Sequence, residues 1–333
     1  MWLVTPARTD DLPALLALAR LAGSGITNLP ADPDALAARL AWSCESFART
    51  ATAPDNELYI LVLRHSETGA IGGTAMLFSR VGARWPFYSY KLSQFSQASR
   101  ELNRVVPLSL LSLVTDHDGA SEVGGLFLHP DQRAGGLGKL LARSRYLFIA
   151  QSRARFADRI IAELRGVSDA QGQSPFWDAI GRKFFGMSFP EADAFNAAHG
   201  SQFIADLMPR QPIYTALLPD TAQAVIGQPH PGGRGALAML TREGFAQENY
   251  LDIFDGGPTL TARTDQLLTV RSARRTRLSG HAEEGTPALI ASGQGAEFRA
   301  FATPLGAQGT TLPAEAARAA RLSLKDELLH VPL

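Results

Sequence analysis

Hydrophobic and polar positions in the first part of the chain predict a strand, two helices and a β-hairpin. A short apolar start ends in a strand at 4–6. Thr9-Asp10-Asp11 then provides helix N-cap chemistry before apolar residues at helical spacing, and a second helix is expected over 32–48. The β-prone run 58–64 and the run 70–78 are joined by a polar turn that ends in glycine, which predicts a hairpin.

The middle of the chain predicts a strand, a helix and another strand in succession. The run 122–129 is typical of a strand closed by Pro130, residues 136–154 show helical spacing, and 158–165 is again β-prone. The stretch 85–112 mixes aromatic and polar residues, and we expect it to form a loop and a helix that pack on the sheet. Further along the chain we expect a short helix over 175–185, a helix over 235–243 and a strand over 250–254.

The chain changes character at about residue 260. Beyond it, short β-like pieces alternate with turns rich in Gly, Thr and Pro, at 288–291, 298–302 and 328–331. We therefore expect two regions. Residues 1–260 form the first, with a second lobe beginning at about 190, and 261–333 form a small β-rich C-terminal subdomain.

Composition narrows the classes of partner. Of the 333 residues 45% are hydrophobic, as in globular proteins. Lys and Arg number 32 and Asp and Glu also 32, so the zero net charge argues against nucleic acid or an anionic membrane as the main partner. The start lacks the long apolar core of a signal peptide, and nowhere do about 18 apolar residues follow one another. We expect a cytoplasmic protein with no membrane partner.

Neither disulfide nor metal chemistry is expected. Cys44 is the single cysteine, which excludes an intrachain disulfide and the four-ligand cysteine zinc sites. The seven histidines are scattered, and none forms a His-x-x-x-His pair. The sequence therefore predicts no metal site.

A glycine-rich turn between a strand and a helix carries the clearest chemical signal. Glycines allow backbone N–H groups at a helix start to approach an anion closely, and the helix dipole adds a positive potential there. A diphosphate is the natural guest. The candidate binding residues are Arg133, Ala134, Gly135, Gly136, Leu137, Gly138 and Lys139.

Two common nucleotide-binding motifs fit this turn less well. A Walker loop requires Ser or Thr after Gly-Lys, whereas Leu140 follows Lys139. The dinucleotide fingerprint requires a third glycine where Leu141 stands. Tight packing of the strand on the helix, without a ligand, would also account for three glycines.

Several blocks of sequence carry a family resemblance. They are Gly25-Ile-Thr-Asn-Leu-Pro30, Asp116-His117 with Glu122, Leu126-Phe-Leu-His-Pro-Asp131, Arg133 to Gly138, Ser144-Arg145, Glu163-Leu-Arg165-Gly-Val167, Ser174-Pro-Phe-Trp177, Phe203 to Pro209, Pro212-Ile-Tyr-Thr215, Val225-Ile-Gly-Gln-Pro-His-Pro231 and Tyr250 to Thr259. The glycine turn resembles the pyrophosphate loop of the acyl-CoA-dependent N-acyltransferases of the GNAT superfamily, Gln/Arg-x-x-Gly-x-Gly/Ala after a central strand. Over about residues 1–260 the chain is similar to the arginine N-succinyltransferase family.

The resemblance implies a fold and a reaction. The fold would be α/β (an α+β mixed sheet) and GNAT-like, with a small, mostly β C-terminal extension. The reaction would transfer succinyl from succinyl-CoA to the α-amine of L-arginine by direct attack in a ternary complex, the first step of arginine breakdown by the succinyl route. Succinyl-CoA would be a co-substrate, with no permanently bound cofactor. Gly124-Gly125 departs from a more usual Cys-Thr-like pair, which could change the acyl pocket.

Two alternatives to this reaction stay open. One keeps the fold and changes the substrate to ornithine, another amine or another acyl-CoA. The other is a CoA-binding subunit that is active only with a paralogous chain, because some members of the family use paired, related α and β chains. The small-molecule partners would thus be L-arginine and succinyl-CoA, and the chain would form a homodimer or a heterodimer with a related subunit.

The resemblance also implies roles for single residues. It places a proton-donating catalytic histidine at His230 and contacts to CoA at Leu126 and Leu128. Histidine suits proton transfer near neutral pH. A loop histidine that makes one structural hydrogen bond is the alternative for His230.

Further polar residues are candidate substrate contacts. Glu163 could act as a base or bind the guanidinium, and Arg165 could bind a carboxylate, although a structural ion pair explains the two equally well. Asp252 and Asp255 could bind the guanidinium or simply form a turn, and His117 also fits a turn. One arginine run is expected to be a solvated face, with a contact to the adenosine 3′-phosphate as the alternative: Arg271, Arg274, Arg275 and Arg277.

Overall fold

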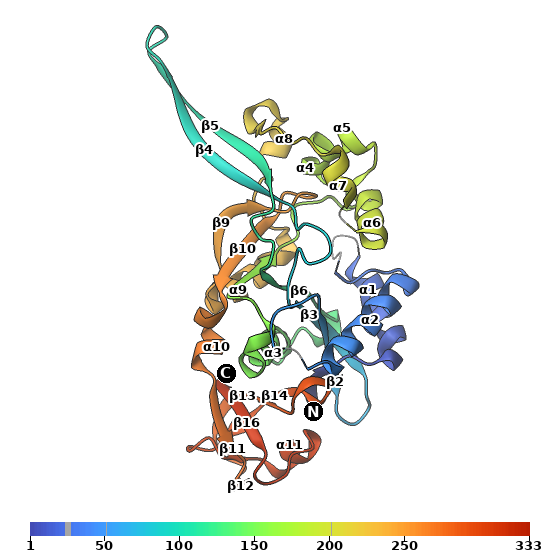
Figure 1. The fold of residues 1–333 in the computed structure, drawn as a ribbon. Coiled ribbons are helices and arrows are strands. Elements are labelled where there is room, and N and C mark those ends of the chain that lie inside the picture. The colour runs from blue at the N-terminus through green and yellow to red at the C-terminus, as the bar shows by residue number, and fades with distance from the viewer. Residues whose placement is uncertain (24–27, 51, 201) are drawn as a thin grey trace.

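The computed structural model describes residues 1–23, 28–50, 52–200 and 202–333. A mixed sheet of fourteen strands forms the frame of the molecule (Figure 1). In sheet order the strands are β11 (Arg274–Arg277), β16 (Glu327–Pro332), β13 (Thr286–Ser292), β14 (Arg299–Leu305), β1 (Trp2–Pro6), β2 (Leu58–His65), β3 (Ile71–Phe78), β6 (Ser121–Leu128), β7 (Arg159–Glu163), β10 (Pro258–Arg263), β9 (Ala246–Leu251), β4 (Ser89–Ser99), β5 (Arg104–Val114) and β8 (Ile213–Tyr214). The predicted mixed α/β fold is confirmed.

The centre of the sheet is covered on both faces, which explains its continuous apolar runs. In β2, Ile60 and Val62 pack in the cluster formed with α1 (Leu12–Ala22) and α2 (Pro33–Ala48). Leu61 and Leu63, which point to the opposite face, pack in the cluster that includes α3 (Leu137–Gln151). A strand buried on both faces needs apolar residues at every position rather than at alternate ones.

The predicted hairpin of β2 and β3 and the strand–helix–strand succession of β6, α3 and β7 are confirmed. The pieces expected near the C-terminal end are also strands, namely β13, β14 and β16. Two more short strands, β12 (Gly280–His281) and β15 (Thr311–Leu312), pair in parallel in a sheet of their own. β14 pairs with β1 through Ala300 and Val4, so strands from both sides of residue 260 share one sheet. The division of the chain at about 260 stays a prediction.

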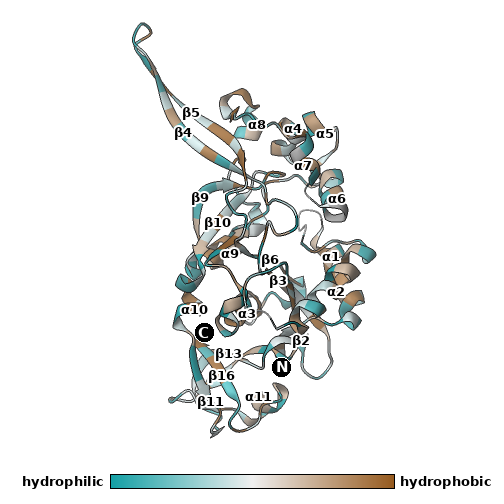
Figure 2. Ribbon diagram, in the orientation of Figure 1, coloured by the Kyte–Doolittle hydropathy of each residue, from teal (hydrophilic) through white to brown (hydrophobic). Residues whose placement is uncertain are grey.

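The expectation of a loop and a helix over 85–112 is wrong. β4 and β5 pair antiparallel over their whole length, and the arm they form projects from the body (Figure 1). Near the body, β4 also pairs with β9 at Tyr90 and Lys91, and β5 pairs with β8. The outer part is exposed on both faces, so its sequence lacks the alternation that marks a strand with one buried face, as the mixed colours of the arm show (Figure 2).

A group of helices packs beside the base of the arm (Figure 1). The helix expected over 175–185 is broken into α4 and α5, and α6, α7 and α8 were not predicted. Their bounds are α4 (Pro175–Ala179), α5 (Gly181–Phe185), α6 (Phe189–His199), α7 (Gln202–Leu207) and α8 (Asp220–Gln223). They pack around Trp177 in a hydrophobic cluster that also includes Tyr90 and Leu251.

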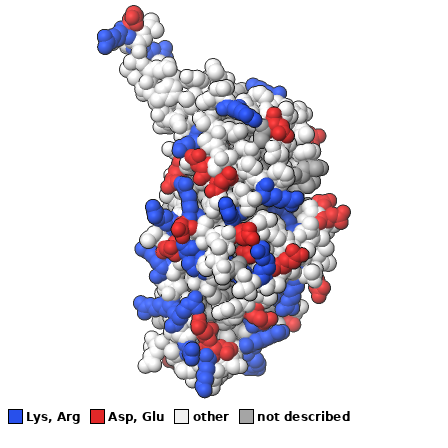
Figure 3. All heavy atoms as spheres, viewed as in Figure 1, with Lys and Arg blue, Asp and Glu red and all other residues white. Residues whose placement is uncertain are grey.

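The described residues form three further α-helices: α9 (Arg234–Glu243), α10 (Leu268–Ser272) and α11 (Ala314–Ala319). The first agrees with the helix predicted over 235–243. None of the helices in the described ranges is both long and apolar enough to cross a membrane. Basic and acidic side chains are interspersed over the face seen in Figure 3, in keeping with the zero net charge.

Candidate active site

The main cavity of the structure opens where β6 and β7 separate. These parallel strands pair only at Ser121 with Ile160 and at Glu122 with Ile161 in the described chain. Beyond that point the cavity extends between β6, β7, α3 and α9 and continues along α2 and residues 80–88, with a total volume of about 2290 Å³. Ligand pockets commonly measure about 300–1,000 Å³. The space therefore admits a large ligand together with a second, smaller one.

A bulge in β6 shapes the floor of the cavity. Thr74 of β3 pairs with Phe127 and Met76 pairs with Gly124, so Gly125 and Leu126 lie opposite one residue. Gly125 has φ +54, and a Cβ there would lie 2.7 Å from the Met76 side chain. A bulge removes backbone groups from the ladder, which frees them for a ligand. Leu126 and Leu128 both line the cavity, as predicted for contacts to CoA.

The glycine turn lies at the start of α3 and lines the cavity. Gly135 and Gly136 have φ +62 and +79, a conformation that favours glycine. The first amides of a helix have no carbonyl partner within it and carry its positive dipole end. Six of the seven predicted residues line the cavity: Arg133, Ala134, Gly135, Gly136, Gly138 and Lys139. Leu137 instead packs against the core.

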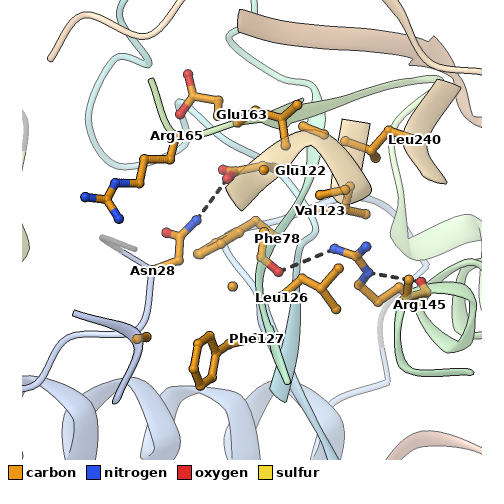
Figure 4. A pocket seen from close by; sticks show the side chains of 18 of the residues that line it. Asn28, Phe78, Glu122, Val123, Leu126, Phe127, Arg145, Glu163, Arg165 and Leu240 are labelled. Carbon is orange, nitrogen blue, oxygen red and sulfur yellow. Dashed lines mark hydrogen bonds between the residues drawn. The ribbon is translucent and has the colours of Figure 1, made fainter. Parts of the chain in front are cut away.

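Carboxylates line another part of the cavity. Glu122 of β6 is 5% exposed, and Asn28 donates a hydrogen bond from Nδ2 to its Oε1 at 3.0 Å (Figure 4). Burial raises the pKa of Glu122 to about 7. On β7, Glu163 accepts a hydrogen bond from the Thr259 hydroxyl at 3.3 Å. Burial and the neighbouring charge of Asp252 raise the pKa of Glu163 well above its usual range.

Asp252 and Asp255 build the turn after β9. Asp255 accepts hydrogen bonds from the backbone N–H groups of Gly166, at 2.7 Å, and Gly257, at 2.9 Å. Asp252 accepts from the N–H groups of Phe254 and Asp255. Both line the cavity. The turn-forming role is thus observed for both residues, and contact of Asp255 with the guanidinium stays a prediction.

His230 lies in a loop tied to the end of β7. Its backbone N–H donates to the carbonyl of Arg165 at 2.8 Å, and Pro229 and Gly166 form an isolated bridge. Nδ1 accepts from the N–H of Gly232 at 3.1 Å, so the neutral ring carries its proton on Nε2. Burial and the charge of Arg165 lower the pKa of His230. His230 lines the cavity and can donate from Nε2.

Arg165 lies beside Glu163 at the carboxylate end (Figure 4). Its Nη2 donates to the hydroxyl of Ser168 at 2.6 Å. Its Nε is buried and has no hydrogen-bond partner in the described part of the chain. Arg165 and Glu163, both described, form no ion pair with each other, so that alternative is wrong and the guanidinium keeps donors for a ligand.

Sequence reasoning missed Asn28 and Glu122 as a pair, and the support that Arg145 gives the bulge. Arg145 of α3 is 3% exposed and donates from Nη1 to the Gly124 carbonyl at 3.4 Å (Figure 4). An arginine in the buried stripe of a helix was the available signal. Of the block 25–30, residues 25–27 lie outside the described chain.

Two other sets of candidates lie outside the cavity lining. His117 is fully buried, its ring centroid 4.3 Å from that of Tyr250, and burial lowers its pKa to about 4. In the arginine run, Arg275 pairs with Glu327 of β16. Within the described ranges, no three His, Cys, Asp or Glu side chains are placed to hold a metal ion.

The sequence of this chain is similar to those of known acyltransferases. Residues 2–269 match the family described as arginine N-succinyltransferase beta subunit. Arginine N-succinyltransferase subunit beta of Pseudomonas aeruginosa is 41% identical over 324 residues, covering 97% of this chain and 95% of that protein. Arginine N-succinyltransferase of an Enterobacter species is 43% identical over 309 residues, covering 90% and 88%.

A solved structure extends the likeness to the fold. Arginine/ornithine succinyltransferase subunit AI from Pseudomonas aeruginosa has a TM-score of 0.90 and 36% identity, covering 100% of this chain and 98% of that one. The resemblance inferred from the sequence blocks is thereby confirmed. The chain belongs to the arginine N-succinyltransferase family of acyltransferase enzymes.

Proposed function

We propose that this chain transfers succinyl from succinyl-CoA to the α-amine of L-arginine, giving N2-succinyl-L-arginine and CoA. The observation that carries the proposal is one cavity with opposite ends. A helix start and exposed cations suit an anionic ligand at one end, and buried carboxylates suit a cationic amino acid at the other.

The helix start holds the diphosphate of CoA in this proposal. Backbone amides at Gly135 to Gly138 face the anion, with Arg133 and Lys139 beside them. The pantetheine then follows the opening between β6 and β7 past Leu128 and Leu126. The thioester carbonyl reaches the bulge, where a backbone N–H stabilises the developing oxyanion.

Glu122 takes the proton from the α-ammonium of arginine. Only the neutral amine is a nucleophile, and the ordinary pKa of an α-amino group is about 8. A carboxylate with a pKa of about 7 is well matched to accept that proton at neutral pH. The Asn28 amide fixes the carboxylate through Oε1 and leaves Oε2 for the substrate.

The bond changes are a direct acyl transfer. The amine nitrogen forms a bond to the succinyl carbonyl carbon, and the carbon–sulfur bond breaks. As the tetrahedral intermediate collapses, the attacking nitrogen loses its second proton and the leaving thiolate of CoA gains one. Nε2 of His230, whose tautomer is set by Gly232, donates its proton to the thiolate in this transfer and is reprotonated by the proton from the nitrogen, so the ring ends neutral. Glu163 binds the guanidinium, Arg165 binds a substrate carboxylate, and Asp255 holds the backbone between them in place.

A two-by-two assay tests the substrates. Arginine and ornithine are each offered with succinyl-CoA and with acetyl-CoA, and product is measured by mass spectrometry. Succinyl-arginine should form fastest. Ornithine is included because the solved relative is named for both amino acids. Slower turnover with arginine and succinyl-CoA than with the other pairs would contradict the assignment.

Assembly is a second part of the proposal. Two of the compared proteins are named as subunits. The arm of β4 and β5 supports a contact with another chain, as a homodimer or with a related subunit, because its outer end exposes apolar side chains such as Leu102 in the turn and Val105 of β5. Light scattering of the purified chain distinguishes the states, and inactivity rescued by a paralogous chain would favour the heterodimer.

A further inference from the structure

The cavity continues past the glycine turn into a basic groove between α3, α9 and α10. Lys139 and Arg143 of α3 and Arg242 of α9 line it. In the part of the chain that the structure describes, none of the three forms an ion pair. The groove therefore holds three positive charges against one nearby carboxylate, that of Glu243, whose charge acts on Arg143 without forming an ion pair with it.

Arg143 is held in place by neutral groups. Its Nε donates to the Thr269 hydroxyl at 3.0 Å, and its Nη1 donates to the carbonyl of Pro332 at 2.9 Å. The Thr269 hydroxyl in turn donates to the buried Glu243 carboxylate at 2.9 Å. Burial lowers the pKa of Arg143, but a guanidinium stays charged in proteins. Its Nη2 has no hydrogen-bond partner among the described residues and is left for a ligand.

The spacing of the cations matches a ligand with two separated anionic groups. Lys139 and Arg143 are four residues apart and share one face of α3. Arg143 lies six residues after the start of the helix, about 9 Å along its axis. A diphosphate at the helix start would thus leave Arg143 to meet a second phosphate beyond it.

We propose that Arg143, positioned by Thr269 and Pro332 and assisted by Lys139 and Arg242, binds the 3′-phosphate on the ribose of the CoA substrate. The inference rests on the proposed use of succinyl-CoA. A phosphomonoester has the charge and the acceptor oxygens that a preoriented guanidinium binds best. The run 271–277 does not take this role, because none of its arginines lines the cavity.

The C-terminal part of the chain, beyond residue 260, thereby takes part in substrate binding. Thr269 comes from α10 and Pro332 from the end of β16, and both orient a side chain of α3. The β-rich C-terminal part thus contributes to the CoA site by holding Arg143.

Isothermal titration of CoA and 3′-dephospho-CoA tests the inference. In the wild type, CoA should bind about 10- to 100-fold more tightly than 3′-dephospho-CoA, the usual effect of a charge-assisted hydrogen bond. Arg143→Ala should remove most of that difference, with binding of 3′-dephospho-CoA within about twofold of the wild type. Arg271→Ala, on neighbouring α10 and outside the cavity, is the matched control and should change neither value.

Other results overturn the inference in distinct ways. Equal losses for both ligands in Arg143→Ala, or no loss, would exclude a 3′-phosphate contact. If that variant fails to fold, Arg242→Ala, at an exposed position, still tests the groove. The affinity for CoA should then fall several-fold while the affinity for 3′-dephospho-CoA is unchanged. An equal change in both affinities would contradict the inference. Equal affinity of the wild type for both ligands removes this subsite but leaves the proposed function standing. Binding of neither ligand removes both.

Discussion

Two histidine–proline turns of this chain have the same local structure and different surroundings. His129 and His230 each precede a proline with nearly equal backbone angles, φ −52 and ψ 135 against φ −50 and ψ 141. In each, Nδ1 accepts an N–H from two residues ahead, at 3.3 Å from Asp131 and 3.1 Å from Gly232. The local sequence therefore gives both rings the same backbone hydrogen bond, although Nδ1 of His129 also lies 3.6 Å from the Asp131 carboxylate.

The two turns differ in what lies around them. His230 lines the cavity and is joined to the end of β7 through the Arg165 carbonyl. His129 lies at the end of β6, outside the cavity lining. Only His230 can therefore reach a substrate in the cavity. The position of His230 in the fold, and not its local His-Pro sequence, therefore makes it the candidate proton donor.

The largest expected effect separates the two histidines directly. His230→Ala should lower kcat about 10²- to 10⁴-fold, because the leaving thiolate loses its proton donor. His129→Ala removes a ring with the same local hydrogen bond and should keep activity within about twofold. Steady-state assays measure both, and titration with CoA should show nearly unchanged binding. Similar losses in the two variants would contradict the assignment of His230.

Removing the carboxylate charge of Glu122 on β6 should have the next largest effect on turnover. Glu122→Gln keeps the shape and the contact with Asn28 but cannot accept a proton, so turnover should fall about 100-fold. Glu101→Gln at the tip of the arm is the matched control, since it makes the same change far from the cavity. Wild-type turnover in Glu122→Gln would remove Glu122 from the mechanism.

A smaller effect is expected from loosening the attachment of the His230 loop. A Cβ at Gly166 would overlap the backbone of Asp255, so Gly166→Ala should move the turn on which His230 depends. We expect about tenfold slower turnover and a loss of about 1–3 kcal/mol in the free energy of unfolding. Gly235→Ala, where a Cβ meets no atom within 4 Å, should be stable. Denaturant unfolding and assay of both variants check this, and a fully active Gly166→Ala would show that the attachment is unimportant.

The smallest effect is expected from a change in the glycine turn at the start of α3. Gly136→Ala must adopt a left-handed φ of +79, which costs about 1–2 kcal/mol. The loop should hold CoA less well, and we expect KM for succinyl-CoA to rise several-fold with kcat nearly unchanged. Initial-rate kinetics over a range of succinyl-CoA concentrations measure this. A fall in kcat alone would place the loop in the chemical step instead.

The sequence allowed prediction of those features that depend on neighbouring residues. The hairpin 58–78 has its own turn signal, and the glycine turn at 133–138 has its own spacing. The Asn28–Glu122 hydrogen bond joins residues 94 apart, so no local pattern could indicate it. The role of Gly124 follows from that contact, because a Cβ there would lie 2.5 Å from the Asn28 amide.

The arm was not predicted, although its two strands are neighbours in the sequence. Strands are recognised by the face they bury, and the outer part of β4 and β5 buries neither face. Asp255 shows a third case, since the Gly-Gly turn was recognisable but the contact with Gly166 across the fold was not.

The pH dependence of kcat/KM for arginine tests the central claim most directly, that buried Glu122 accepts the proton of the amine. Glu122 acts only when ionised, and its pKa is raised to about 7. In the wild type kcat/KM should therefore rise with pH through about 7, before the rise due to the amine of free arginine. Glu122→Gln should lack the rise near 7 and keep the later one. The same rise near pH 7 in wild type and variant would contradict the role of Glu122 as the base.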